Sequence, residues 1–341
     1  MKKVYILLFV LSLGMVFCSG CSNEMAGEEV IEKIKETTTD SVEGNFRQYQ
    51  IQWKEFDKKL VCDVLLENFD ESNIPPEQKN GTTIIEQGNR SLFLTSNGGL
   101  DYLDSQDAAY IGTLFFYYLF GELTNKEVDL HSEVKYLQDV ELVQKAEEEI
   151  SEIVGTEELH LNRACRLTRE ELADLEKALK EVEEGMETVG QWEAEEYIAV
   201  EYTLTKDNII IMGIDEPQQP YVMDVWGAQA AYIQAVLGEG KILYLSMRGI
   251  IETTGEEEVV TLITKEEAVE IVKAAEANVV SGDTWKNQEI QLEYVPVPDW
   301  TASIPEPETL IPYWCIIRSN GEAESVIRIN AVTGGNLAYG E

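Results

Sequence analysis

The chain has 341 residues, more than the roughly 100–200 of an ordinary domain, which predicts two domains or one large body. Hydrophobic residues make up 44% of it, enough to build a core, so a wholly disordered protein is excluded. The 26 basic and 64 acidic residues give a formal net charge of −38, which repels nucleic acid and excludes it as a partner. This charge is interpreted as serving solubility, with attraction of divalent cations or basic partners as the alternative.

The N-terminus has the layout of a secretory signal. Lys2 and Lys3 precede an apolar stretch at 4–17, whose 14 residues are too few for a transmembrane helix of about 20. The next four residues, CSGC at 18–21, resemble the lipobox of bacterial lipoproteins. The resemblance implies a signal peptide at 1–20, a diacylglyceryl group on Cys21, and a lipid anchor on the extracytoplasmic face of the cell membrane. An ordinary secretory signal with an incidental cysteine is the alternative.

Residues 21–44 are polar and acidic after the cysteine and are predicted to form a flexible tether. No later stretch reaches about 18 apolar residues, so no further membrane span is predicted. Cys62, Cys165 and Cys315 lie far apart and lack zinc-site spacing, so they are interpreted as small buried hydrophobes, with one disulfide as the alternative.

The first part of the folded body is predicted to consist mainly of strands. They are expected at 49–53, 60–66, 82–86 and 91–95, with a loop at 73–81 and turns at 88–89 and 97–99. The aromatic stretch 108–120 is interpreted as a core helix or strand. Lining of a ligand pocket, or contact with a partner, is the alternative.

Three helices are expected from periodicity and capping. The first spans 139–154, and the others begin after Thr168 and Thr264, each of which is followed three residues later by a glutamate, as in a capping box. The helix after Thr168 carries an apolar seam, which favours packing on the chain's own sheet over a partner helix. The helix after Thr264 is expected to bury Ala268, Ile271, Val272 and Ala275.

Further strands surround the last helix. They are expected at 195–205, 209–214, 231–237, 242–247, 257–263, 289–295, 313–317 and 326–330, with a proline-rich loop at 296–312. Because both faces of 313–317 are apolar, with Trp314 on one and Tyr313 on the other, this strand is predicted to be central and covered on both sides.

The fold class predicted from this pattern is α+β with largely antiparallel sheets, because most strand pairs are joined by short Gly, Asn or Asp turns. The expected organisation is a signal peptide at 1–20, a tether at 21–44, an N-terminal α+β domain at 45–190 and a C-terminal α+β domain at 191–341.

The closing segment resembles the PepSY-like module of exported Gram-positive proteins, including the YycH and YycI type of kinase regulators. The matching segments are 264–275, Leu-Glu-Tyr at 292–294, Pro-Tyr-Trp at 312–314 and the turn at 329–335. With the lipobox, the whole chain resembles an uncharacterised family of clostridial lipoproteins. The resemblance implies a PepSY-like C-terminal fold that binds or restrains a partner protein.

No sequence motif for catalysis was found: nucleophile elbows, zinc-protease motifs, phosphate loops and EF-hands are all missing from the sequence. No catalytic, cofactor-binding or metal-binding residue is therefore predicted, and no cofactor. His131 and His160 stand beside acidic residues and are interpreted as surface histidines in ion pairs, with a pH-sensitive or metal site as the alternative.

Two classes of function follow. The favoured one is a non-enzymatic, membrane-anchored protein that binds a protein or peptide. The alternative is a small-molecule or substrate-binding lipoprotein, in which the stretch 110–120 and Trp192, Trp226 or Trp300 line a pocket.

Overall fold

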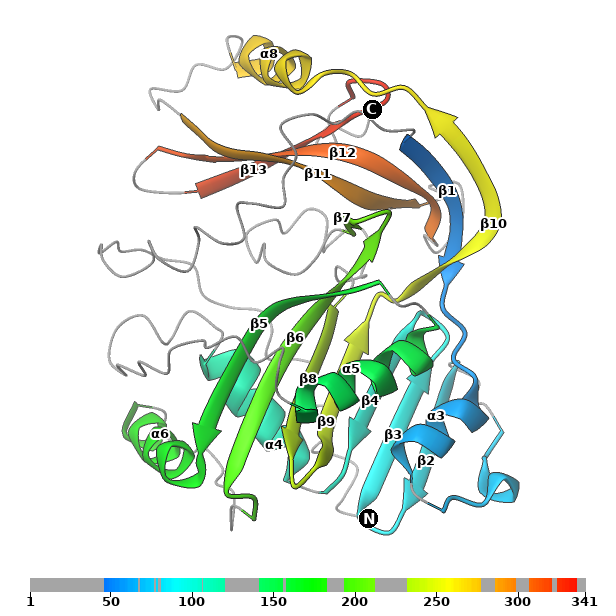
Figure 1. The fold of residues 1–341 in the computed structure, drawn as a ribbon, viewed down its shortest axis with the longest axis vertical. Helices are drawn as coiled ribbons and strands as arrows, with labels where there is room; N and C mark the ends of the chain where they lie inside the picture. The colour runs from blue at the N-terminus through cyan, green and yellow to red at the C-terminus, as the bar shows by residue number, and fades with distance from the viewer. Residues whose placement is uncertain are drawn as a thin grey trace.

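The computed structural model contains two antiparallel sheets, one above the other in Figure 1. It describes residues 46–66, 68–76, 78, 81–105, 107–119, 141–155, 158–182, 193–211, 232–276, 286–298, 307–320 and 324–335. The signal, Cys21 and the tether lie outside these ranges. The architecture is α+β, as predicted, and the strand pairs of both sheets are antiparallel.

The smaller sheet joins the two ends of the described chain. Its order is β10-β1-β12-β11, with β13 also paired to β12. The strands are β1 (Phe46–Trp53), β10 (Ile251–Val260), β11 (Lys286–Pro298), β12 (Pro307–Ser319) and β13 (Glu324–Asn330). Helix α8 (Lys265–Glu276) covers the face of this sheet that is turned away from the larger sheet (Figure 1).

The larger sheet has the order β2-β3-β4-β9-β8-β6-β5, with β7 paired to β6. Its strands are β2 (Thr82–Gln87), β3 (Arg90–Thr95), β4 (Gly99–Leu103), β5 (Leu159–Thr168), β6 (Glu196–Lys206), β7 (Ile209–Ile210), β8 (Tyr232–Gly238) and β9 (Lys241–Arg248). Because β5 pairs with β6 along its length, residues on both sides of position 190 share this sheet. The chain therefore divides between the sheets differently from the predicted boundary at 190.

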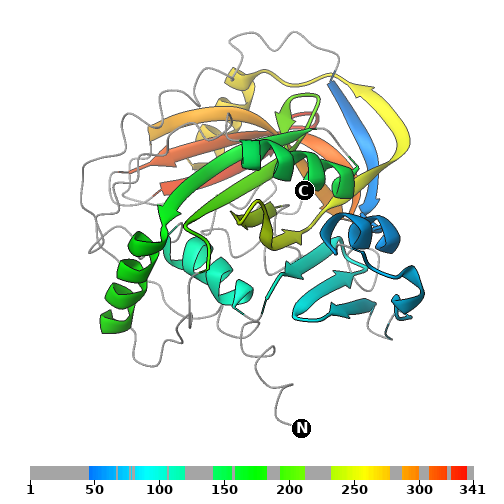
Figure 2. The same ribbon diagram turned by 60° about the horizontal axis from the view of Figure 1, so that its bottom comes forward.

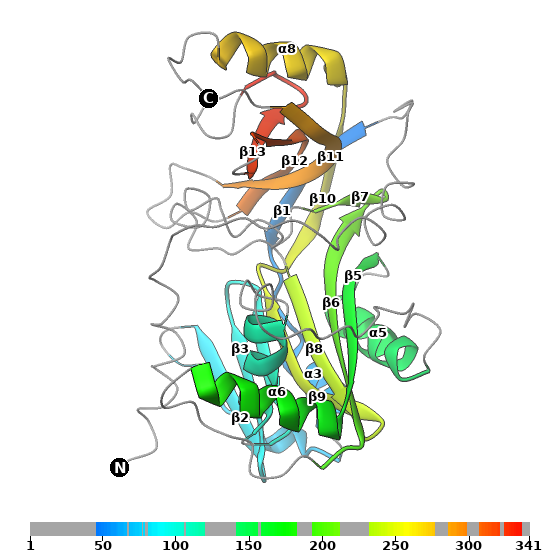
Figure 3. The ribbon, with the colours of Figure 1, turned by 90° about the vertical axis from the view of Figure 1, so that its left-hand side faces the viewer.

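Helices cover both faces of the larger sheet. The helices are α3 (Lys58–Leu65), the 3-10 turn Glu71–Asn73, α4 (Ala108–Thr113) with its π-helical continuation Leu114–Leu119, α5 (Glu141–Val154) and α6 (Arg169–Val182). Figure 3 shows α5 on one side of the sheet and α4 on the other, and Figures 1 and 2 show α6 next to α4.

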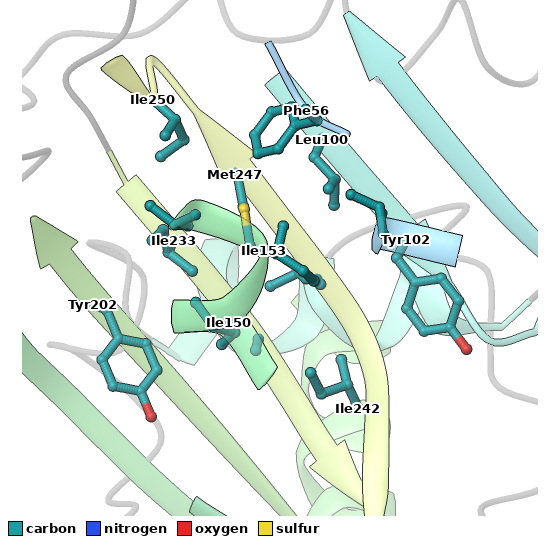
Figure 4. Packing of buried hydrophobic residues seen from close by; sticks show 14 of the residues in the cluster. Phe56, Leu100, Tyr102, Ile150, Ile153, Tyr202, Ile233, Ile242, Met247 and Ile250 are labelled. Atoms are coloured by element: carbon teal, nitrogen blue, oxygen red, sulfur yellow. The ribbon is translucent and has the colours of Figure 1, made fainter. Parts of the chain in front are cut away.

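The main core lies between the larger sheet and α5. Ile150 and Ile153 of α5 are buried against Ile233, Met247 and other apolar side chains of the sheet (Figure 4). A second cluster on the opposite face contains Ile111, Leu114 and Phe115, so the aromatic stretch at 108–120 is a core helix in its described part.

The prediction of a strand at 60–66 is wrong, because this segment forms α3. Asp57 caps the helix by accepting hydrogen bonds from the backbone N–H groups of Lys59 (2.9 Å) and Leu60 (3.2 Å). The buried side chains follow the helical spacing: they are Val61, Cys62, Leu65 and Leu66. A short apolar run fits either structure, and the cap decides between them.

Both predicted capping boxes are confirmed. The Glu267 N–H donates to Thr264 Oγ1 (3.1 Å), while the Glu267 carboxylate accepts from the Thr264 N–H (2.7 Å), and Thr168 and Glu171 repeat this exchange. Ala268 and Val272 of α8 are buried as predicted. Ala275 is exposed, contrary to prediction, since the cluster into which α8 packs includes no residue of α8 beyond Val272.

The central position of β12 is confirmed. Trp314 and Ile316 are buried on the face covered by α8, and Tyr313 and Cys315 are buried on the other. Strands β11 and β13 flank this half of β12.

Candidate functional site

A row of polar side chains crosses four neighbouring strands of the larger sheet. Asp101 on β4 lies opposite Ser246 on β9, Ser246 opposite Gln234 on β8, and Gln234 opposite Glu201 on β6. Residues directly opposite each other point to the same face of a sheet, so these four share one face. We call them the polar row. Tyr244 stands two residues before Ser246 on β9, so both side chains point to the same face. Tyr244 packs against Phe116, which follows α4 in the chain. The polar row therefore lies on the face that α4 covers.

The members of the polar row bond to one another. Ser246 Oγ donates to Asp101 Oδ1 (2.8 Å), and Gln234 Nε2 donates to Glu201 Oε2 (2.8 Å). Arg248, at the end of β9, donates from Nη2 to Asp101 Oδ2 (2.6 Å) and from Nη1 to the Met247 carbonyl (2.8 Å). The residue paired with Glu201 on β5 is Arg163. The row is therefore a hydrogen-bonded network rather than a set of open ligands.

Burial changes sharply along this network. Ser246 and Glu201 are only 2% and 1% exposed, whereas the Asp101 and Arg248 side chains at the other end are 31% and 33% exposed. Gln234 is also partly exposed, and a solvent-borne group can reach the Asp101 end of the row as the described residues leave it.

The titratable groups around the network hold their protons near neutral pH. Burial raises the pKa of Tyr232 and Tyr244, and a hydrogen bond with Ser246 offsets this only in part. Burial opposes the charge on Arg248, but the Asp101 carboxylate outweighs it, so the pKa of Arg248 is raised. The two tyrosines therefore stay protonated and the arginine stays charged, so proton transfer through them is not favoured near neutral pH.

A second polar cluster joins the two sheets. The β6–β7 hairpin turns at Asp207 and Asn208, both at positive φ, and carries Asp207 to the smaller sheet. There Asp207 accepts a hydrogen bond from the hydroxyl of Tyr49 on β1, and Lys206 Nζ lies 5.1 Å from the centre of the Tyr49 ring. Next to it Ile211 forms a parallel bridge with Tyr294 on β11. We call this set of contacts, made by Lys206, Asp207 and Ile211 with the smaller sheet, the clasp.

The smaller sheet contains a buried ion pair. Arg328 Nε on β13 lies 3.1 Å from Glu293 Oε2 on β11, across the intervening strand β12. Gln291 Nε2 donates to the other carboxylate oxygen at 2.7 Å. The pair is satisfied internally, as buried charges must be, and is interpreted as structural.

The third feature is the outer edge of β10. This strand ends the order of the smaller sheet, and Figure 1 shows it along the rim of the molecule. Its residues at 253–255 and 257–259 are all exposed, including Val259 at 62%. Three glutamates on β10 bond back toward β1: Glu258 accepts from Gln48 (2.6 Å), Glu252 from Gln52 (2.8 Å) and Lys54 (3.0 Å), and Glu257 lies 3.5 Å from Arg47.

Most of the residues singled out in the sequence cannot be placed in the fold. Cys21, His131, Trp192, Trp226 and Trp300 lie outside the described residues. His160 is on β5 opposite Thr203, half-buried rather than exposed, and burial lowers its pKa.

The three cysteines of the folded body are buried, as predicted, and none of them is in a disulfide among the described residues. Burial raises the pKa of Cys62 to about 11, which disfavours the reactive thiolate. Within the part of the chain that the structure describes, no group of three or more His, Cys, Asp or Glu could hold a metal ion, and no helix is long and apolar enough to cross a membrane.

The polar row and the open edge were not predicted from the sequence. Glu201 and Ser246 each interrupt a strongly apolar strand, and this interruption was the visible signal. Their partners could not be identified, because the register of strands distant in sequence is set by the whole sheet.

Comparison with known proteins gives little. No family model and no curated protein matches the chain. Among solved structures, an uncharacterised protein from Eubacterium rectale is similar with a TM-score of 0.46 at 14% identity, over 85% of this chain and 84% of that one. The C-terminal domain of YpeB from Bacillus megaterium is similar with a TM-score of 0.33 at 12% identity, over 82% of this chain and 92% of that one. Similarities at this level carry no argument about function.

Proposed function

We propose that the protein is a lipid-anchored, extracytoplasmic lipoprotein that binds another protein or a peptide and catalyses no reaction. The observation that carries this proposal is the outer edge of β10, which no other described element covers, since an exposed strand edge offers backbone hydrogen bonds to an extended segment of a partner. The polar row supports the same choice, because its carboxylates are already occupied by Ser246, Arg248 and Gln234.

The anchor in this proposal is a diacylglyceryl group on Cys21, held at the membrane while residues 22–44 act as the tether. The PepSY-like part in this proposal is the C-terminal segment, in which α8 is followed by the antiparallel strands β11, β12 and β13. The whole chain is proposed to be a member of the clostridial lipoprotein family.

The anchor and the binding function are tested together. Tagged protein is cross-linked on intact cells, solubilised in detergent and captured, beside a Cys21→Ser variant. We expect the wild type to partition into the detergent phase with a reproducible cross-linked partner, and the variant to be released or to remain uncleaved. Detergent partitioning of a Cys21→Ser variant from which the signal peptide has been cleaved would contradict the anchor, and repeated capture without any cross-linked protein or peptide would contradict the binding function.

A second candidate function is the binding of a small polar ligand at the exposed end of the polar row. One observation favours it: Asp101 and Arg248 are a third exposed there and lie beside the hydroxyl of Ser246. A thermal-shift screen with small amines, carboxylates and sugars tests it, with Asp101→Asn as the variant that should remove any stabilisation. Shifts that survive this variant would argue against the polar row as the site.

A further inference from the structure

We propose that β10 is a docking edge for an extended segment rich in lysine or arginine, which adds to the smaller sheet as a new strand. This inference rests on the proposed function and names the chemistry of the partner. Three observations carry it: the strand is uncovered, its outward backbone groups can be identified, and its charge selects the partner.

The uncovered state of β10 follows from exposure on both of its faces. Successive side chains of a strand point to opposite faces, yet those of Thr253, Thr254 and residues 257–259 are all exposed. Among the described elements, the hydrogen-bonded neighbour of β10 is β1 alone. The opposite edge of the sheet differs, because Ile211 bridges to β11 at Tyr294 and because Pro296 and Pro298 cannot donate hydrogen bonds.

The register identifies which groups point outward. The Lys54 N–H donates to the Ile250 carbonyl at 2.9 Å, and Trp53 is paired with Ile251. Hydrogen-bonded and non-hydrogen-bonded pairs alternate along an antiparallel ladder, so the pair of Trp53 and Ile251 is not hydrogen-bonded. The backbone of the next residue, Glu252, bonds to β1, and that of Thr253 does not. The N–H and C=O groups of Ile251 and Thr253 therefore point away from β1. Ile251 is only 8% exposed, so Thr253 is the exposed residue that offers these groups to an incoming strand.

The charge on the edge selects a basic strand. Glu258 is bonded to an uncharged amide, and Glu257 is half-exposed beside Arg47, so both still present negative charge to solvent. A second copy of β10 would place glutamates opposite glutamates, which is destabilising and protects the edge against self-pairing. Lysine or arginine at the same positions would instead face opposite charge. Val259, 62% exposed, adds an apolar contact beside them.

The test uses the purified protein and an eight-residue peptide that alternates lysine with threonine or valine. A peptide with glutamate in place of lysine is the matched control. We expect the lysine peptide to bind, to bind more weakly as salt is raised, and to slow hydrogen exchange at the amide of Thr253. The glutamate peptide should neither bind nor slow this exchange.

Variants locate the binding. Thr253→Pro removes an outward N–H without removing a bond to β1 and should weaken the affinity about fivefold or more. Glu257→Gln with Glu258→Gln should weaken it by about threefold to tenfold. Glu266→Gln with Glu270→Gln, on exposed positions of α8, is the matched control and should leave the affinity unchanged. Circular dichroism checks that the Thr253→Pro variant is folded. If it is not folded, hydrogen exchange in the wild-type protein with the lysine peptide decides the test.

The inference is overturned if peptide affinity is unchanged in the folded β10 variants, if the exchange protection falls outside 251–260, or if the glutamate peptide binds equally well. Self-association through β10 in solution would also overturn it. Cross-linking to a cellular partner that persists in the β10 variants would overturn this docking edge while leaving the proposed binding function intact.

Discussion

Trp314 is a large buried side chain of the smaller sheet. It is buried beneath α8, and its indole Nε1–H donates to the Ile263 carbonyl at 3.0 Å. Trp314→Ala removes a large ring and leaves that carbonyl without its partner, so we expect a loss of roughly 3–5 kcal/mol in the free energy of unfolding. Urea denaturation measures it, with Trp53→Ala as a half-buried control that should cost less. A Trp314→Ala protein as stable as wild type would mean that this ring is not buried.

His160 makes folding stability depend on pH. Burial lowers its pKa in the folded protein, so the unfolded chain binds the proton more tightly. Its contribution to stability is complete above the unfolded pKa of about 6.5 and is lost as the pH falls toward the folded value. Between about pH 7 and pH 5, the wild type should therefore lose more stability than His160→Gln does. Parallel denaturation curves at a series of pH values check this, and identical pH profiles would contradict it.

At the scale of single elements, the capping box of α8 gives a clean comparison. Thr264→Ala removes the oxygen that accepts the Glu267 N–H and should cost about 1 kcal/mol, whereas Thr264→Ser keeps that oxygen and should cost little. Both are measured by chemical denaturation. Equal losses in the two variants would show that the methyl group, and not the cap, stabilises this helix.

Elements with local signals were predictable from the sequence, and those fixed by distant contacts were not. Hairpins such as that around Asp207 and both capping boxes have their determinants within a few residues. Helix α3 was mistaken for a strand because its cap at Asp57 was overlooked. Strand β5 was missed because a bulge after Leu161 breaks its alternation. The polar row depends on the pairing of four strands, which no local pattern encodes.

At the scale of the whole molecule, the clasp connects the two sheets. Tyr49→Phe removes the hydrogen bond to Asp207 but keeps the ring against Tyr294, whose centre lies 5.8 Å away. We expect a loss of about 1–2 kcal/mol, felt in both sheets, because the hairpin that bears Asp207 belongs to the larger one. Residue-resolved hydrogen exchange on β12 and β6 measures this. A loss confined to one sheet would mean that the clasp does not couple them.

The central claim of this account is that the outer edge of β10 is open, and hydrogen exchange in the free protein tests it most directly. The Glu252 amide, bonded to β1, should exchange slowly, and the amide of the exposed Thr253, which points outward, should exchange rapidly. This contrast between two consecutive residues is the predicted result. Equal protection of both amides would show that the edge is already covered and would contradict the account.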